Sequence, residues 1–370
     1  MAGVSATAPR HRILIPEETM ARAGEYLATL RANASPGKYL ANRLGGRDLA
    51  AITPEAFLGE LVETKKPCIF AESVVYGDGS DWNLTELGLL GDISVAVPVT
   101  IFDDGKHQNP SVHRPPFAGT LVYTPGALLA TGAGNVAADQ DAVLSADGTI
   151  CDEGYYALYR RRLLPVFEYV NAHAGRPRSA FVTIPGLGCG QFAGKFRGTL
   201  GAKLEQALER FLREHGEAFP NIKAVYFDPY EECSNARHEI HGLSFLVRPF
   251  TKRAGGGKAQ LCRPAEYAEA GDDFSACDLY SVVAWDHVSW PGNDFYAGSR
   301  ATDDGVKAAA TSSMEVLTGV AGEYAEREAK YQPPNPYHTW EGVVGNGRSP
   351  RSLRLWNSAA VWRQESGDEQ

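Results

Sequence analysis

Two stretches of the chain share one order of features, and that order constrains the fold more than any other property of the sequence. Each begins with a short apolar run, at 181–184 and at 279–285, that is typical of a buried strand. An irregular loop follows, and then apolar residues recur at helical spacing, over 200–215 and 302–317. Strands that alternate with helices in this way predict an α/β protein whose strand-end loops bind anionic ligands.

The loop in the first of these stretches is rich in glycine, at positions 186, 188, 190, 194 and 198. Glycine lets a backbone adopt positive φ and approach a ligand closely, and backbone N–H groups before a helix favour a diphosphate. The loop differs from the phosphate loop of NTPases, because Lys195 is not followed by Ser or Thr. It also fails to match the dinucleotide-binding GxGxxG pattern with its partner acidic residue. A diphosphate cradle is therefore a hypothesis at this stage.

The loop in the second stretch carries three aspartates, Asp286, Asp294 and Asp304, separated by 8 and 10 residues. Carboxylates that converge repel one another, so one retains a proton while another stays charged, as in the acid and base roles of glycosidic chemistry. Each aspartate also has a structural explanation, because Thr302 or an aspartate beside it caps the following helix and Asp294 suits a turn. As a set after a buried strand, the three favour function.

The rest of the chain predicts further strands and helices around these two stretches. We expect strands over 68–77, 93–102, 119–129, 222–228 and 243–248, and helices over 17–33, from 53 onward, and over 155–173 with a kink at Pro165. The economical architecture is a three-layer α/β/α sandwich with a central mixed sheet. We expect an N-terminal helical extension (1–66), a main domain (67–325) and a C-terminal tail packed on the body (326–370).

Composition excludes several classes of function. A formal net charge of −9 without a basic stripe argues against binding nucleic acid. No apolar run approaches the ~20 residues of a membrane span, and the first residues lack the apolar core of a signal peptide. The six cysteines form no CxxC pair and the histidines no HExxH motif, so we expect no metal site, no disulfide framework and no cofactor. We expect a cytoplasmic protein, and the sequence does not bear on delivery into another cell.

Taken together, the two loops indicate a family. The sequence GLGCGQFAGKF before a Leu-rich helix resembles the diphosphate loop of macrodomains, particularly that of the poly(ADP-ribose) glycohydrolase branch. The pattern WDxxSxPGNDF followed by TDDG resembles the loop that holds the distal ribose in a divergent group of macrodomain proteins, which includes the Legionella effector MavL. The resemblance implies a macrodomain-like fold and removal of ADP-ribose from arginine, with ADP-ribosylated ubiquitin as one substrate of that group.

The resemblance also implies roles for individual residues. Asp286, Asp294 and Asp304 correspond to the group's acidic active-site residues. The implied ADP-ribose contacts are Gly188, Cys189, Gly190, Gln191, Phe192, Trp290, Gly292, Asn293 and Phe295, although Trp290 and Phe295 suit an apolar core equally well. Two alternatives stay open, namely a reader that binds ADP-ribose without cleaving it and a hydrolase whose aspartates hold Mg²⁺.

Overall fold

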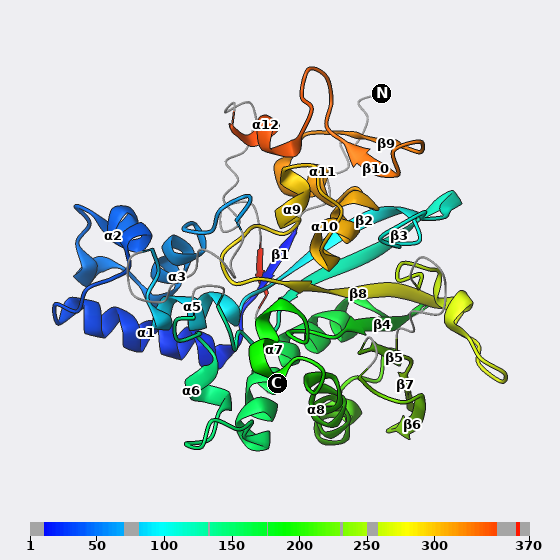
Figure 1. Ribbon diagram of the computed structural model, residues 1–370, viewed down its shortest axis with the longest axis horizontal. Coiled ribbons are helices and arrows are strands. Elements are labelled where there is room, and N and C mark those ends of the chain that lie inside the picture. Colours follow the sequence, from blue (N-terminus) through cyan, green and yellow to red (C-terminus); the bar gives the residue numbers. More distant parts are fainter. Residues whose placement is uncertain are drawn as a thin grey trace, which may run out of the picture.

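A nine-stranded mixed sheet forms the centre of the protein, which we describe from a computed structural model (Figure 1). The structure describes residues 11–69, 81–131, 134–175, 177–229, 232–249 and 258–345, and the backbone of 360–362. The strands of the sheet are β1 (Arg12–Leu14), β2 (Ser94–Asp103), β3 (Val112–Pro125), β4 (Ser179–Pro185), β5 (Ile222–Asp228), β6 (Ala236–Ile240), β7 (Leu243–Val247), β8 (Cys277–Trp285) and β11 (Ala360–Trp362).

The strands follow the order β11-β1-β2-β3-β8-β4-β5-β7-β6. Within the run β3-β8-β4-β5-β7, each strand is parallel to the next one. Strands β1, β2 and β3 pair antiparallel with one another, and β6 pairs antiparallel with β7. A parallel block needs helical crossovers, which explains the alternation of strands and helices in the sequence.

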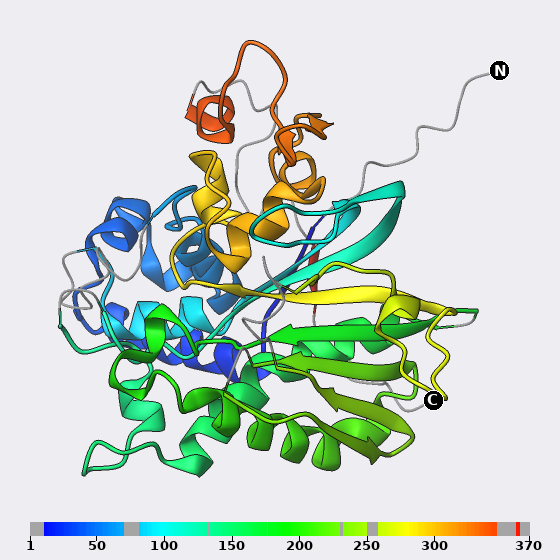
Figure 2. The same cartoon turned by 45° about the vertical axis from the view of Figure 1, so that its right-hand side comes forward.

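Helices cover both faces of the sheet, as Figures 1 and 2 show. On one face, α7 (Asp152–His173) and α8 (Leu200–His215) pack on inward residues such as Val182 and Val225. The other face carries most of the remaining helices: α1 (Glu17–Arg31), α3 (Pro54–Val62), α5 (Leu84–Gly91), α9 (Asn293–Tyr296), α10 (Asp303–Ala309) and α11 (Ser313–Thr318). Successive strand residues thus enter two separate cores, which confirms the predicted three-layer sandwich.

Smaller elements complete the chain. They are α2 (Lys38–Leu44), α6 (Gln140–Val143), α12 (Trp340–Gly345) and the separate hairpin of β9 (Glu323–Ala325) and β10 (Lys330–Gln332). Rings from these elements stack on the main domain, since Phe102 of β2 lies against Tyr324 and Tyr331, and Tyr331 lies against Trp340. No helix of the described residues is long and apolar enough to cross a membrane.

The local predictions are confirmed for most elements, and three of the differences concern the interior or the extent of a predicted element. Helix α7 runs without a break through Pro165, which is buried in the interior of the helix. The helix expected over 302–317 divides into α10 and α11, because Thr311 between them forms a bridge with Ile101 of β2. Most of the strand expected over 68–77 lies outside the described residues.

Candidate active site at the carboxyl ends of β3, β8 and β4

Three loops meet where three neighbouring parallel strands end. The β3 loop (126–139), the glycine-rich loop (186–198, after β4) and the acidic loop (286–302, after β8) leave the sheet at adjacent positions. The amide of Leu129 donates to the carbonyl of Phe192 at 3.0 Å, and the Phe192 ring meets the His287 ring edge-on at 6.2 Å. The two stretches that the sequence singled out therefore touch each other at the edge of the sheet where α/β proteins bind ligands.

The glycine-rich loop packs so tightly on the β3 loop that side chains are excluded from the contact. Gly188 has a φ of 72°, and a Cβ added there would lie 2.7 Å from the Ala127 amide nitrogen. A Cβ at Gly126 would lie 2.1 Å from the Gly188 nitrogen. The Tyr159 hydroxyl of α7 fixes this contact by donating to the Leu187 carbonyl and accepting from the Ala127 amide. Gly188 is required by its positive φ, and both Gly126 and Gly188 are required because the two backbones approach each other closely.

Beyond this contact lie three consecutive backbone N–H groups without a partner among the described residues. In the described part of the chain, no acceptor lies opposite the amides of Gly190, Gln191 and Phe192. The amides of Gly198 and Gly201, at the start of α8, are by contrast taken by the Glu232 carboxylate. Any anion that this loop binds is therefore expected at 190–192 rather than at the N-terminus of α8.

The thiol of Cys189 does not suit a nucleophile. It is buried, and its Sγ lies 3.6 Å from the Leu187 carbonyl. Burial, reinforced by the negative charge of Glu232, raises the pKa of the Cys189 thiol far above its ordinary value. Because only the thiolate reacts readily, the residue serves as a small side chain in a tight loop.

In the acidic loop, Asp286 shapes the turn directly after β8. One of its carboxylate oxygens accepts from the amides of Val288 at 2.7 Å and Ser289 at 2.6 Å. The other accepts from the Ser289 hydroxyl and from the Asn293 side-chain amide. The carboxylate is therefore surrounded by donors of its own loop, which fixes the path of the chain toward α9.

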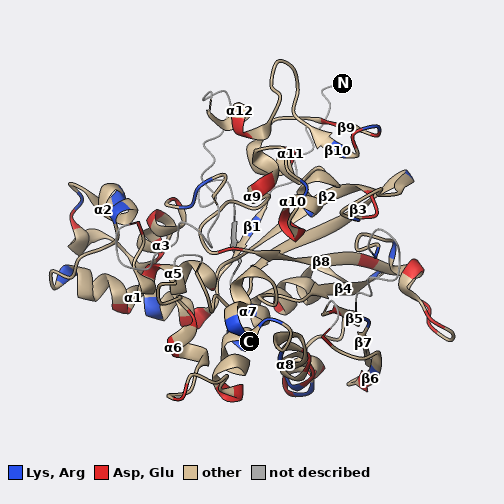
Figure 3. Cartoon of the chain, in the orientation of Figure 1, with Lys and Arg blue, Asp and Glu red and all other residues tan. Residues whose placement is uncertain are grey.

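Asp294 and Asp304 hold the far side of the same loop. Asp294 accepts from the amides of Ala301 and Thr302 and from the Thr302 hydroxyl, at 2.6–3.2 Å. Asp304 accepts from the amides of Gly292 at 2.5 Å and Asn293 at 3.1 Å. Thr302 is also the N-cap of α10, because its hydroxyl accepts from the Gly305 amide. Figure 3 shows acidic residues on both α9 and α10.

The three carboxylates influence one another. Burial, together with the negative charges of Asp294 and Asp286, raises the pKa of Asp304 well above its usual range. The neighbouring residue Asp303 has a cation as its partner: its carboxylate pairs with the ammonium of Lys307 at 2.5 Å and accepts from the Ala284 amide. The site thus combines one carboxyl group of raised pKa with other acidic groups close by, which is the arrangement that acid–base chemistry uses.

A segment of the N-terminal region covers the acidic loop. Lys66 exchanges backbone hydrogen bonds with Val288 and Trp290, and Ile69 forms two hydrogen bonds with the Asn293 side chain. Asp286, Asp294 and Asp304 are 7%, 2% and 4% exposed. The segment 65–69 is thus a wall of the site, which no local sequence signal indicated.

Within this wall, Lys65 is a fully buried cation. Its ammonium donates to the His287 carbonyl at 2.5 Å and lies 4.0 Å from the centre of the Trp285 ring. Burial lowers the pKa of Lys65 to about 7, although the Asp286 carboxylate opposes this shift. The Trp290 indole donates to the Lys65 carbonyl, so Trp290 belongs to the packing of this wall. Phe295 is likewise buried in the apolar core.

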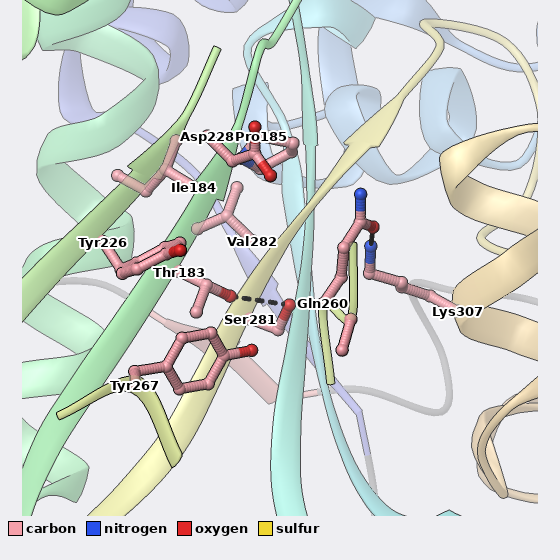
Figure 4. Close-up of a pocket in the computed structure, with 11 residues that line it drawn as sticks. Thr183, Ile184, Pro185, Tyr226, Asp228, Gln260, Tyr267, Ser281, Val282 and Lys307 are labelled. Carbon is pink, nitrogen blue, oxygen red and sulfur yellow. Dashed lines mark hydrogen bonds between the residues drawn. The ribbon is translucent and has the colours of Figure 1, made fainter. Parts of the chain in front are cut away.

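A small cavity lies beside the site, on the face of β4, β5 and β8 that α10 covers (Figure 4). Thr183 and Ser281 bond to each other at its floor, and Gln260 meets Lys307 at one wall. Its volume of about 20 Å³ holds little more than one water molecule, far less than a nucleotide sugar needs. Among the described residues, no group of three His, Cys, Asp or Glu side chains is placed to hold a metal ion.

Comparison with known protein families gives a match that spans all three loops. The family model described as macrodomain effector MavL matches residues 11–337. The matched region begins just before β1 and therefore includes the helices and the wall segment that precede the central strands. No curated protein matches the sequence.

Proposed function

Because the chain belongs to the macrodomain effector MavL family, whose role is related to ADP-ribose, we propose that it removes ADP-ribose from arginine side chains of modified proteins. The observation that carries this proposal is the contact between the two loops. The charges of Asp286 and Asp294 in the acidic loop act on Asp304 at the start of α10. His287 of the same loop touches Phe192, next to the amides of the glycine-rich loop that have no acceptor among the described residues. One nucleotide sugar that lay along both loops would place its diphosphate at 190–192 and its distal ribose beside the carboxylates.

The chemistry of the linkage suits this pair of loops. Hydrolysis breaks the bond between C1 of the ribose and an arginine nitrogen, the oxygen of water bonds to C1, and the protons of water are shared between the new hydroxyl and the departing guanidine. A carboxylate accepts two hydrogen bonds from the planar guanidinium group, and we assign this role to Asp294. A second carboxylate takes a proton from the attacking water, and the raised pKa of Asp304 suits it for that role.

Asp286 has a different part in this proposal. Its four hydrogen bonds within the loop hold the turn that brings Asp294 and Asp304 together. Since all three aspartates are buried in the free protein, substrate entry requires the segment 65–69 or the acidic loop to shift. In this proposal, four residues support ADP-ribose binding indirectly, through the shape of the acidic loop and its packing on the segment 65–69. They are Trp290, Gly292, Asn293 and Phe295.

The test is release of ADP-ribose from arginine-modified protein, with ADP-ribosylated ubiquitin as one substrate and glutamate-modified protein as the comparison. We expect release from arginine, undiminished by EDTA, and a loss of about 10²-fold or more in Asp294→Asn and Asp304→Asn. The matched control is Asp278→Asn, on an exposed aspartate at the opposite end of β8, which should leave the rate unchanged. Release from arginine that persists in both loop variants would refute the assignment.

A second function is favoured by one specific observation. Every one of the three carboxylates already accepts hydrogen bonds from its own loop, which suits a protein that binds ADP-ribose without cleaving it. Micromolar binding of ADP-ribose with no release from either linkage would select this reader function over the hydrolase.

A further inference from the structure

One histidine joins all three loops of the site. His287 follows Asp286, is fully buried, and lies with its ring edge-on to Phe192 of the glycine-rich loop. Its Nε2 lies 3.3 Å from a carboxylate oxygen of Asp139, at the end of the β3 loop. No motif in the sequence indicated this residue, because its partners are far away along the chain.

The charges around His287 decide which ring nitrogen carries the proton. Asp139 also receives the Arg162 guanidinium at 2.8 Å and the Leu128 amide at 2.7 Å. Burial alone would raise the pKa of Asp139, but Arg162, His287 and the amide together lower it, so the carboxylate is ionised and only accepts. The Nε2 of His287 is then the donor. Burial lowers the pKa of His287 against the opposing effect of Asp139, with Arg162 and Lys65 adding to the lowering, so the ring is neutral and Nδ1 is bare.

The direction of Nδ1 follows from the packing of the ring. A Cβ added at Gly91, at the end of α5, would lie 2.3 Å from both Cδ2 and Nε2 of His287. The edge formed by those two atoms therefore faces α5, and Nδ1 is the ring atom opposite that edge. Among the described residues, no donor reaches this buried nitrogen. A buried acceptor without a partner is costly, and native proteins retain such groups mainly where a ligand or water satisfies them.

We propose that Asp139 and His287 form a carboxylate–imidazole pair within the ADP-ribose site, in which Nδ1 of His287 accepts a hydrogen bond from a hydroxyl group of the distal ribose. This inference rests on the proposed function, which places that ribose beside the acidic loop. The diphosphate has only acceptor oxygens at neutral pH, so it cannot satisfy a bare nitrogen, whereas each ribose hydroxyl is a donor. His287 would thereby connect ribose binding to the contact between the two loops.

The experiment measures the affinity for free ADP-ribose by titration calorimetry in the wild-type protein and in His287→Gln. Glutamine retains an N–H that can donate to Asp139 but offers no acceptor at the position of Nδ1. We expect the affinity to fall about tenfold. The matched control is His113→Gln, because His113 is also buried and bonded through Nε2, to the Leu261 carbonyl at 2.7 Å, but lies outside the site. An affinity of folded His287→Gln within about twofold of the wild type would overturn the proposal.

A measurement on the wild-type protein covers the case in which His287→Gln does not fold. In protein labelled with ¹⁵N-histidine, one ring must be in the Nε2–H form, and the signal of its bare nitrogen must shift when ADP-ribose is added. A titration with no such shift overturns the proposal. Binding that depends on His287 without release from arginine would refute only the hydrolase function, and release together with unchanged binding in His287→Gln would refute only the present inference.

Discussion

The glycine-rich loop and the acidic loop lie in contact at one edge of the sheet, yet they keep their shapes by opposite means. The first relies on missing side chains, with Gly188, Gly194 and Gly198 at φ values of 72°, 54° and 91°. The second relies on charged side chains, since the carboxylates of Asp286, Asp294 and Asp304 accept hydrogen bonds from its backbone. In the acidic loop the same atoms therefore support the fold and the proposed chemistry, so a loss of activity there has to be compared with a loss of stability.

The largest effect on stability is expected where the glycine-rich loop meets the β3 loop. In Gly188→Ala the new Cβ would lie 2.7 Å from the Ala127 nitrogen and 3.0 Å from the Tyr159 hydroxyl, at a positive φ. We expect a loss of about 3 kcal/mol in the free energy of unfolding, together with weaker ADP-ribose binding. Denaturant unfolding and calorimetry provide the two measurements.

Gly190→Ala is the matched variant for that experiment, because a Cβ at Gly190 would meet nothing within 4 Å. It should cost less stability than Gly188→Ala and still weaken binding, if a diphosphate lies against 190–192. Equal stability losses in the two variants would contradict the steric account of this loop.

The next largest loss of stability is expected in the acidic loop, if its shape depends on its carboxylates. In Asp286→Asn the amide group replaces a carboxylate oxygen that accepts from neighbouring donors, so we expect a loss of about 1–3 kcal/mol in unfolding free energy. The control is Asp273→Asn, since Asp273 accepts from the amide and hydroxyl of Ser275 in a similar turn but is exposed. If the loss of unfolding free energy were as small in Asp286→Asn as in Asp273→Asn, the acidic loop would not depend on the hydrogen bonds that the Asp286 carboxylate accepts.

The smallest effect concerns the pH dependence of stability through Lys65. The pKa of Lys65 is lowered from 10.5 to about 7 in the folded protein. Below pH 7 the side chain is therefore protonated in both the folded and the unfolded state, and the folded protein bears the full free-energy cost of burying the charge. Between about pH 7 and 10.5 the unfolded state binds more protons, and stability gains at most about 1.4 kcal/mol per pH unit from this group.

Urea unfolding at several pH values between 7 and 9 measures this contribution. The rise with pH should be smaller in Lys65→Met than in the wild type. It should be unchanged in Lys195→Met, whose ammonium is exposed and donates to the Gly148 carbonyl. Identical pH profiles of Lys65→Met and the wild type would show that the buried lysine keeps its ordinary pKa.

Sequence patterns predicted those elements that residues close together in the chain specify. Buried strands and amphipathic helices have characteristic patterns of apolar residues, so the sequence predicts β4, β8 and α8 with nearly correct bounds. For the cap of α10 the sequence offered Thr302 or an aspartate beside it, because capping depends on residues within one turn, and the structure shows that Thr302 is the cap. Helix α5 was missed, although Asn83 and Glu86 form a capping box at its start.

Distant contacts could not be predicted in the same way. The wall segment 65–69 meets the acidic loop more than two hundred residues later in the chain, and Asp139 and His287 are separated by 148 residues. Their spacing carries no periodic signal, because the path of the chain through the whole sheet brings them together. For the same reason Trp290 and Phe295 remained ambiguous until their packing was visible.

By itself, the sequence determined the kind of protein: which strands and helices flank the two loops, where glycine is needed, and which loop carries the acids. Those properties depend on backbone geometry and on side-chain periodicity, which neighbouring residues specify. Only the tertiary structure decided how the loops meet, which carboxyl group has its pKa raised, and which buried nitrogen lacks a partner among the described residues. Those properties depend on burial and on charges a few ångströms away in space, and the strand order β3-β8-β4 sets both.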